Sequence, residues 1–217
     1  MHPTQATLNT TLRFAHERLA RQDLLAGDGA SLSLRLPGEE AMLFLSASGA
    51  REERYDFAGV SADTLLAPTL LHANIYRIRA DVGAIMLGGG DFSWALSEFC
   101  GALPSVFDEQ ARHLGIMRVA ATAKPADLLD ALRAGGNSLL VGSLPVCLGV
   151  NCLRMIFNAE LLEKCAKAYV LAKAAGEGVK QLPWWVRRIA NRRLLRDERH
   201  AAQRFASGLI PEEARGY

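Results

Sequence analysis

Apolar and polar positions follow two different periods along this chain. Apolar side chains recur every three to four positions over 5–24 and over 69–80, which predicts two helices with one buried face each. Ser31–Leu36 alternates polar and apolar residues, and Pro37-Gly38 follows as a turn signal. We therefore expect a hairpin that returns over 41–46. The apolar face of the first helix is expected to contain Leu8, Leu12, Phe14, Ala15 and Leu19, and the Gly27-Asp28-Gly29 segment is expected to be a turn.

The segment 68–96 has the order helix, strand, glycine loop, helix. Val82–Leu87 is an apolar run without a polar break, which is typical of a buried strand. Glycines without a Cβ then allow the backbone to turn, and Asp91 stands where a helix N-cap is expected. The amides of this loop are expected to point toward a small anion, because a helix N-terminus carries partial positive charge. A cleft filled by Leu87 and neighbouring side chains, with no ligand, is the equal alternative. The loop glycines are Gly88, Gly89 and Gly90.

Composition is that of a globular protein, with half of the 217 residues apolar and 22% charged. No apolar run is long enough for a transmembrane helix, and the first residues lack the regions of a signal peptide. The four cysteines show no C-x-x-C spacing and lie in apolar stretches, so we expect reduced thiols in a cytoplasmic protein.

Two further segments could carry chemistry. Glu109 and His113 are four residues apart and would share a helix face, with Asp108 beside them. They are candidates for an acid–base pair or for part of a metal site, and a solvated helical turn is the alternative. Farther along, 138–142 and 146–149 are predicted strands.

The last 41 residues form a basic tail that begins within the linker-like Gly176-Glu177-Gly178. Between Lys180 and Arg204 there are eight Lys/Arg and two acids, a net charge of +6, whereas the whole chain has +2 and the rest therefore −4. We divide the chain into a domain over 1–176 and a helical tail over 177–217. The tail is expected to pack on its own body or on a neighbouring subunit. A free solvated helix is the first alternative, and a nucleic-acid or membrane surface beside Trp184-Trp185 is the weaker one.

The segment LHANIYRIRADVGAIM, together with the final long helix around 157–168, resembles the class II aldolase/adducin family over about residues 6–175. The resemblance implies a three-layer α/β/α fold with a central, mostly antiparallel sheet. It also implies a homo-oligomer, most simply a homotetramer, with sites between subunits.

In the catalytic members of that family, three histidines and a nearby carboxylate serve a divalent metal, usually zinc. The matching positions here hold Leu87, Gly89 and Ser143 for the histidines and Pro68 for the acid. The resemblance therefore implies no zinc or other divalent cofactor in this chain. Serines that bind phosphate before the acid correspond to Leu66 and Ala67, which supply no hydroxyl.

Two other elements that contact phosphate in the family have partial matches in this sequence. Ser31 stands in the place of an asparagine on the first strand, and Ser48-Gly49 matches a Thr/Ser-Gly element after the second strand. With Ser143 and the glycine loop, these positions define an expected anion or substrate cleft. His72, on the helix before the glycine loop, is expected to be a packed residue and not a base.

These observations leave three functional hypotheses. The first is a non-catalytic binding or scaffolding homologue of the class II aldolases. The second is a lyase (aldolase) or epimerase acting on a small phosphorylated or carboxylated sugar, with catalytic groups rebuilt from Asp108, Glu109 and His113. The third is a nucleic-acid or membrane-surface binder that acts through the basic tail.

Overall fold

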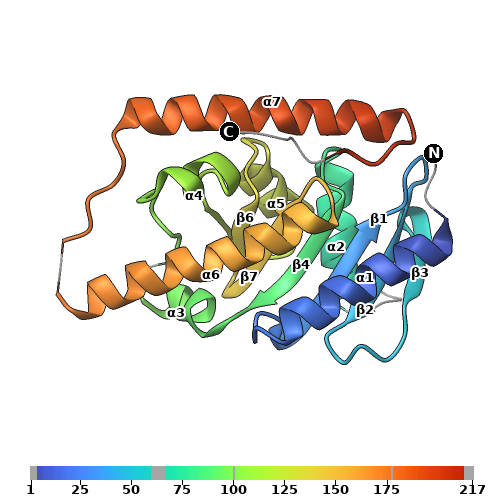
Figure 1. The fold of residues 1–217 in the computed structure, drawn as a ribbon, viewed down its shortest axis with the longest axis horizontal. Helices are drawn as coiled ribbons and strands as arrows, with labels where there is room; N and C mark the ends of the chain where they lie inside the picture. Colours follow the sequence, from blue (N-terminus) through green and yellow to red (C-terminus); the bar gives the residue numbers. More distant parts are fainter. Residues whose placement is uncertain (1–3, 60–66, 100, 177, 213–217) are drawn as a thin grey trace.

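The computed structural model describes residues 4–59, 67–99, 101–176 and 178–212. Figure 1 shows the arrangement of its elements. In chain order they are α1 (Gln5–Ala20), β1 (Ala26–Arg35), β2 (Ala41–Ser46), β3 (Glu53–Asp56), the 3-10 turn η1 (Phe57–Gly59), α2 (Ala67–Ile78), β4 (Ala84–Gly89), α3 (Asp91–Phe99), α4 (Asp108–His113), β5 (Arg118–Ala120), α5 (Pro125–Leu132), β6 (Ser138–Val141), β7 (Leu144–Gly149), α6 (Cys152–Ala174) and α7 (Trp184–Ala206).

One mixed sheet has the strand order β3-β2-β1-β4-β7-β6-β5. Every neighbouring pair is antiparallel except β5 and β6, which are parallel. The predicted hairpin is β1–β2, with Ser31 opposite Ser46 and Arg35 opposite Met42. β4 lies in the centre, between β1 and β7, and all six of its residues are buried. The predicted α/β fold with a mostly antiparallel sheet is confirmed.

Helices cover both faces of this sheet, which makes three layers (Figure 1). On one face, α1 and α6 bury leucines and methionines such as Leu12, Met86 and Met155. On the other face, α2 and α5 enclose Ile75 and Leu87 in a second cluster. Each face of the sheet therefore packs against helices in its own hydrophobic core.

The first helix is shorter than predicted, and one of its apolar residues lies outside the core. α1 begins after Thr4, whose hydroxyl accepts a hydrogen bond from the Thr7 N–H, and it ends at Ala20. Phe14 is 44% exposed, so its prediction as a buried residue is wrong. The buried stripe follows the spacing of Leu8, Leu12, Ala15 and Leu19, and a helical position two residues from Leu12 points to another side.

Two glycine-containing segments that were predicted to be turns belong to strands. Gly27-Asp28-Gly29 belongs to β1, where the pairing with β4 shifts register between Ala26 and Ser31. Positive φ angles at Gly27 (107°) and Gly29 (76°) permit this irregular strand. Gly88 and Gly89 likewise belong to β4, since Gly89 pairs with Ala26. Cross-strand pairing extends both strands through glycines that the sequence pattern assigns to turns.

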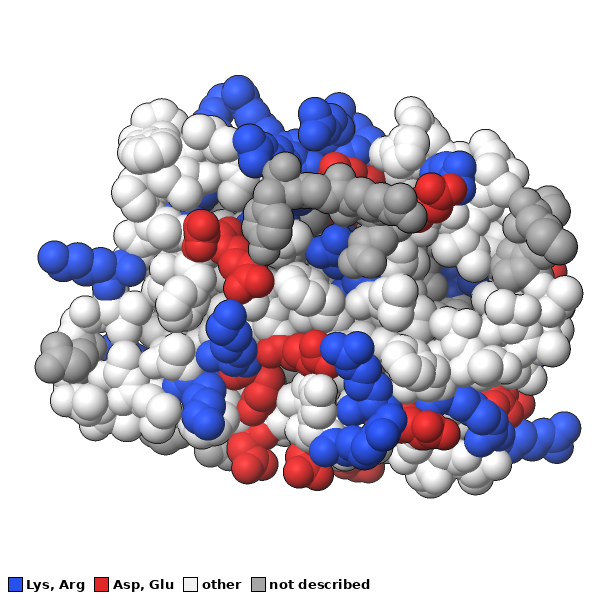
Figure 2. All heavy atoms as spheres, viewed as in Figure 1, with Lys and Arg blue, Asp and Glu red and all other residues white. Residues whose placement is uncertain are grey.

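The basic tail forms α7, which packs one face on its own chain and leaves basic side chains along the upper edge of Figure 2. Its Glu198 accepts the Gly136 N–H at 2.9 Å and lies 3.0 Å from Arg79. Arg79 is buried and also pairs with Asp81 at 2.7 Å. Burial raises the pKa of Glu198, while the Arg79 charge opposes that rise. The tail therefore packs on the domain of its own chain, which is one of the two predicted packing partners.

Three of the four cysteines, Cys147, Cys152 and Cys165, are free and buried, as expected for reduced core thiols. Burial raises the pKa of Cys152 to about 12 and that of Cys165 to about 11, so neither thiol is reactive at neutral pH. Cys100 and Glu177 lie outside the described residues. Within the described ranges, no helix has the length and apolar character needed to cross a membrane.

Candidate functional site

His72, on α2, belongs to a buried chain of hydrogen bonds with side chains of β1. Its Nε2 lies 3.0 Å from the Ser31 hydroxyl, and its Nδ1 lies 2.7 Å from the Ser33 hydroxyl. The chain continues from Ser33 to the Tyr76 hydroxyl at 2.8 Å, and from Ser31 to the Gly29 carbonyl at 3.0 Å. His72 is thus a packed residue, as the sequence predicted.

One direction of donation satisfies this whole chain. The Gly29 carbonyl can only accept, so Ser31 donates to it and accepts from the protonated Nε2 of His72. Nδ1 then accepts from Ser33, which accepts from Tyr76. His72 is neutral in this arrangement, and burial lowers its pKa to about 3. The Ser31 hydroxyl proton, expected to serve a ligand, is therefore engaged within the fold.

The glycine stretch at the end of β4 is packed closely against other parts of the chain. A Cβ on Gly88 would lie 2.7 Å from a backbone oxygen of β1, and one on Gly89 would lie 2.7 Å from the Ser93 Cβ. At Gly90, the same atom would lie 2.6 Å from the carboxyl carbon of Glu163. These glycines are required because neighbouring groups fill the space in front of them.

The Glu163 carboxylate, on α6, binds the first amides of α3. Its two oxygens accept the Phe92 N–H at 2.8 Å and the Ser93 N–H at 2.9 Å, and one of them also accepts the Ser93 hydroxyl. A carboxylate at this place complements the partial positive charge of a helix N-terminus. Asp91, expected to be the N-cap, is instead the first residue of α3 and is exposed. An external anion at these amides would have to displace Glu163.

The positions that correspond to family metal ligands do not suit a zinc ion. Leu87 is fully buried in the core beneath α2, and Gly89 has no side chain. Ser143 offers only a neutral hydroxyl, and the Pro68 ring packs 3.0 Å from the Cβ position of Gly29. Among the described residues, no group of three or more His, Cys, Asp or Glu is placed to hold a metal, whereas zinc requires three or four such ligands. Ala67 begins α2 and Leu66 lies outside the described residues.

A shallow hollow of about 480 Å³ opens at this end of the sheet. The Trp94 indole N–H donates to the Ala26 carbonyl at 3.1 Å, and its ring covers Gly27. Asp28 is exposed on the wall, so the hollow presents a carboxylate as well as the Ser143 hydroxyl. Sequence reasoning found Ser143 but missed Asp28 and Trp94. The residues that line the hollow are Ala26, Gly27, Asp28, Trp94, Ser143 and Leu144.

Ser48 and Gly49 follow β2 at the same end of the sheet but do not line this hollow. The Ser48 hydroxyl hydrogen-bonds Ser46 at 2.7 Å. Gly49 has a φ of +66°, and a Cβ there would lie 2.8 Å from the His16 ring. This segment therefore forms a tight turn against α1.

The side chains of Glu109 and His113 take separate partners. Glu109 accepts from Lys164 at 3.2 Å, whereas Nδ1 of His113 accepts from Arg154 at 2.9 Å. Burial and the nearby Arg154 and Arg112 charges lower the pKa of His113 to about 4. Asp108 accepts the Glu109 N–H at 2.9 Å. The three residues lie on α4, away from the hollow beside Ser143.

A scan against family models finds no match to this sequence, and a search of curated proteins also finds none. Solved structures do match. An L-fuculose 1-phosphate aldolase is 22% identical, with a TM-score of 0.74, and the match covers 88% of this chain and 97% of that one. YgbL from Klebsiella pneumoniae, described as a putative aldolase/epimerase/decarboxylase, is 18% identical with a TM-score of 0.70, covering 87% and 99%. An aldolase II superfamily protein from Pseudomonas syringae is 15% identical with a TM-score of 0.71, covering 98% of both chains.

These matches show that the chain has the class II aldolase fold, as the resemblance in its sequence implied. Because the match to the Pseudomonas syringae protein covers 98% of this chain, it extends into the tail. Identities of this size establish the fold alone, so the chemistry has to be argued from the site.

The neutral state of His72 predicts a pH-dependent stability. Above the unfolded-state pKa of about 6.5, the contribution of His72 is fully present. Below it, the unfolded chain binds a proton that folded His72 does not accept until about pH 3, so stability is lost as the pH falls. The expected slope is at most about 1.4 kcal/mol per pH unit for this one group.

Urea unfolding at several pH values between 7.5 and 5, on wild type and His72→Gln, measures this contribution. The unfolding free energy of the variant should fall less steeply as the pH falls. His113→Gln should also reduce this pH dependence, because the pKa of His113 is lowered to about 4. Equal slopes for wild type and His72→Gln would contradict the assignment.

The second prediction concerns Glu163. Replacing it by alanine leaves two amides and a hydroxyl at the start of α3 without their acceptor, so unfolding should become easier by about 2 kcal/mol. Glu17→Ala is the matched control, because Glu17 is an exposed helical glutamate. Its effect should stay within about 0.5 kcal/mol.

Inorganic phosphate provides a second readout on the same pair of proteins. It should raise the melting temperature of Glu163→Ala more than that of wild type, because the released amides can bind an anion. Equal stability of Glu163→Ala and wild type would show that the carboxylate does not hold this helix terminus.

Proposed function

We propose that this protein is a class II aldolase-like homologue that has lost metal-dependent aldolase chemistry and acts by binding or scaffolding. The observation that supports this most directly is the filling of the ligand positions. Leu87 is fully buried in the core, and Gly89 packs against Ser93 and Pro145. Aldol chemistry of this family requires a metal as electrophile for the enediolate, and these residues cannot supply its ligands. A cytoplasmic location is part of the proposal.

The hollow beside Ser143 is the proposed binding surface at this end of the sheet. Its donors and acceptors are the Ser143 hydroxyl and the Asp28 carboxylate, and the Trp94 ring adds an apolar wall. Such a lining suits a small hydroxylated ligand better than an anion, because Asp28 would repel negative charge. Of the residues expected to form an anion cleft, only Ser143 lines this hollow. We propose that the part of the ligand that contacts Asp28 is polar and uncharged.

The proposal predicts that the purified protein holds no stoichiometric zinc, cobalt or manganese. It also predicts no cleavage of L-fuculose 1-phosphate above the uncatalysed rate, with or without added metal, because no metal-bound electrophile forms. Elemental analysis and a coupled aldol-cleavage assay make the two measurements. An active fuculose-phosphate aldolase assayed in parallel serves as the positive control.

About one tightly held metal per chain, or metal-dependent turnover, would overturn the proposal. Turnover without bound metal would favour the alternative of a lyase or epimerase with rebuilt groups. In that case Asp28→Asn and Glu109→Gln would separate chemistry in the hollow from chemistry on α4.

We also propose a homo-oligomer, most simply a tetramer, with α7 contributing to the contact between copies. The buried face of α7 is used within the chain, but Trp184, Trp185 and Ile189 are 68%, 55% and 50% exposed. Indole side chains are enriched at protein interfaces because they bury a large apolar area. This part of α7 is therefore the proposed contact surface.

Light scattering on wild type and on Trp184→Glu/Trp185→Glu tests this contact. The wild type should have the mass of an oligomer, and the double variant should dissociate because two charges would be buried at the contact. Leu129→Glu, at an exposed leucine of α5, is the control and should keep the wild-type mass. A monomeric wild type, or an unchanged mass in the double variant, would refute the role of α7.

A further inference from the structure

We propose that a cavity beneath α7 binds a small phosphomonoester. The cavity measures about 460 Å³ and lies between α7, α4 and the start of α6. It is at the end of the sheet opposite to Ser143: Val150 follows β7, whereas Ser143 precedes it. Nothing in the class II aldolase resemblance assigns a ligand to this place.

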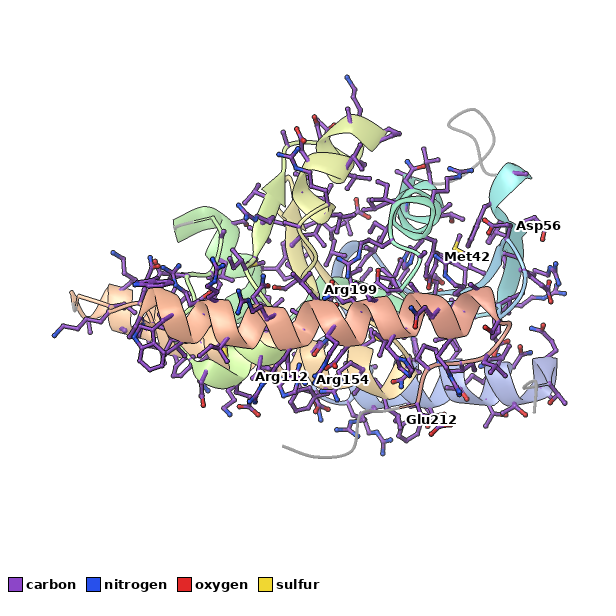
Figure 3. All side chains as sticks on the ribbon, turned by 90° about the horizontal axis from the view of Figure 1, so that it is seen from above. Met42, Asp56, Arg112, Arg154, Arg199 and Glu212 are labelled. Carbon is purple, nitrogen blue, oxygen red and sulfur yellow. The ribbon has the colours of Figure 1, made fainter. Side chains whose placement is uncertain are left out.

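Arginine side chains from three helices line the cavity, together with a histidine of α7. Arg112 comes from α4, Arg154 from α6, and Arg196 and His200 from α7. Figure 3 shows Arg112 and Arg154 on the same side of α7. Arg196 and His200 are four residues apart, so both reach the cavity from one side of their helix. Among the described residues, neither has a hydrogen-bond or ion-pair partner.

The carboxylates on the cavity wall are already engaged by cations or amides. Asp197 pairs with Arg112 at 2.7 Å. Glu198 is bound by Arg79 and by the Gly136 N–H, and it is only 6% exposed. Glu212 pairs with Arg204 at 3.2 Å, although it remains mostly exposed. Among the described residues, Arg196 is thus a wall arginine without a carboxylate partner.

The imidazole of His113 adds to this polarity without adding charge. Its Nδ1 accepts from Arg154, and burial together with the neighbouring arginines lowers the pKa of the ring, which favours its neutral form. A neutral imidazole with Nδ1 as acceptor carries its proton on Nε2. The wall therefore combines guanidinium donors and a neutral imidazole with three carboxylates that already have cationic partners.

A tetrahedral oxyanion fits donors that arrive from opposite walls, and guanidinium groups bind phosphate through paired hydrogen bonds. Asn137 also lines the cavity; it is 2% exposed, and its Oδ1 has no partner among the described residues. This acceptor requires a donor, such as a ligand hydroxyl. The apolar part of the lining, Val150, Leu194, Ala201 and Pro211, would contact the carbon skeleton. A hydroxylated phosphomonoester combines all three features.

Calorimetric titration at about 0.15 M salt, where the Debye length is about 8 Å, tests the proposal with glycerol 3-phosphate, inorganic phosphate and glycerol as probes. The wild type should bind glycerol 3-phosphate more tightly than inorganic phosphate, and glycerol should give no heat. Arg196→Gln should weaken glycerol 3-phosphate binding about tenfold, the usual effect of losing one charge-assisted hydrogen bond. His200→Gln should also weaken it.

Two control variants locate the ligand. Arg188→Gln removes the same charge from an exposed position two turns earlier on α7, and it should change affinity by less than about twofold because salt screens distant charges. Ser143→Ala should have no effect, since Ser143 lines the hollow at the other end of the sheet. Melting curves check that each variant is folded.

Absence of heat for both phosphates would overturn the proposal, as would equal binding in Arg196→Gln and wild type. Equal losses in Arg188→Gln and Arg196→Gln would show general charge attraction and no built site. A loss only in Ser143→Ala would place the ligand in the hollow. None of these outcomes depends on whether the protein holds a metal or cleaves a sugar phosphate, so this inference and the proposed function can fail separately.

Discussion

The bond between the Glu163 carboxylate and the first amides of α3 is the contact on which this architecture depends. A helix begins with N–H groups that have no partner within the helix, and here a carboxylate 70 residues away in the sequence satisfies two of them. The contact fixes α6 over the end of β4. It also requires Gly90 to have no side chain, since the carboxylate fills the space where a Cβ would lie.

The same packing supports the proposed loss of metal chemistry from this class II aldolase fold. An open cleft at the end of β4 would need room for imidazoles at positions 87 and 89. In this chain Leu87 completes the core on one face, and Ser93 and Pro145 close over Gly89. A fold can keep its sheet and helices while the groups at one edge change, because core packing and site chemistry are separate constraints.

The two ends of the sheet therefore differ in what covers them. One end presents a shallow hollow with Trp94 and Asp28. At the other end lies α7, whose Glu198 binds the buried Arg79, which also pairs with Asp81. The Arg79 guanidinium is the counterion of both carboxylates, so its removal would leave two buried negative charges without a cationic partner. This cluster holds α7 in place, and the cavity with Arg196 lies beside it.

From the sequence alone, periodicity and local turn signals predicted the β1–β2 hairpin and the buried β4, because these signals act within a few residues. The fold class and the positions that match the family's metal ligands came from the resemblance to the class II aldolases, and His72 was predicted to be a packed residue. Only the tertiary structure decided that Gly88 and Gly89 are strand, that Ser31 donates inward to Gly29, and that Glu163 occupies the amides of α3. Each of these depends on groups brought together from distant segments, and no local pattern records such a contact. For the same reason, the meeting of Arg112, Arg154 and Arg196 beneath α7 could be found only once three helices were placed in space.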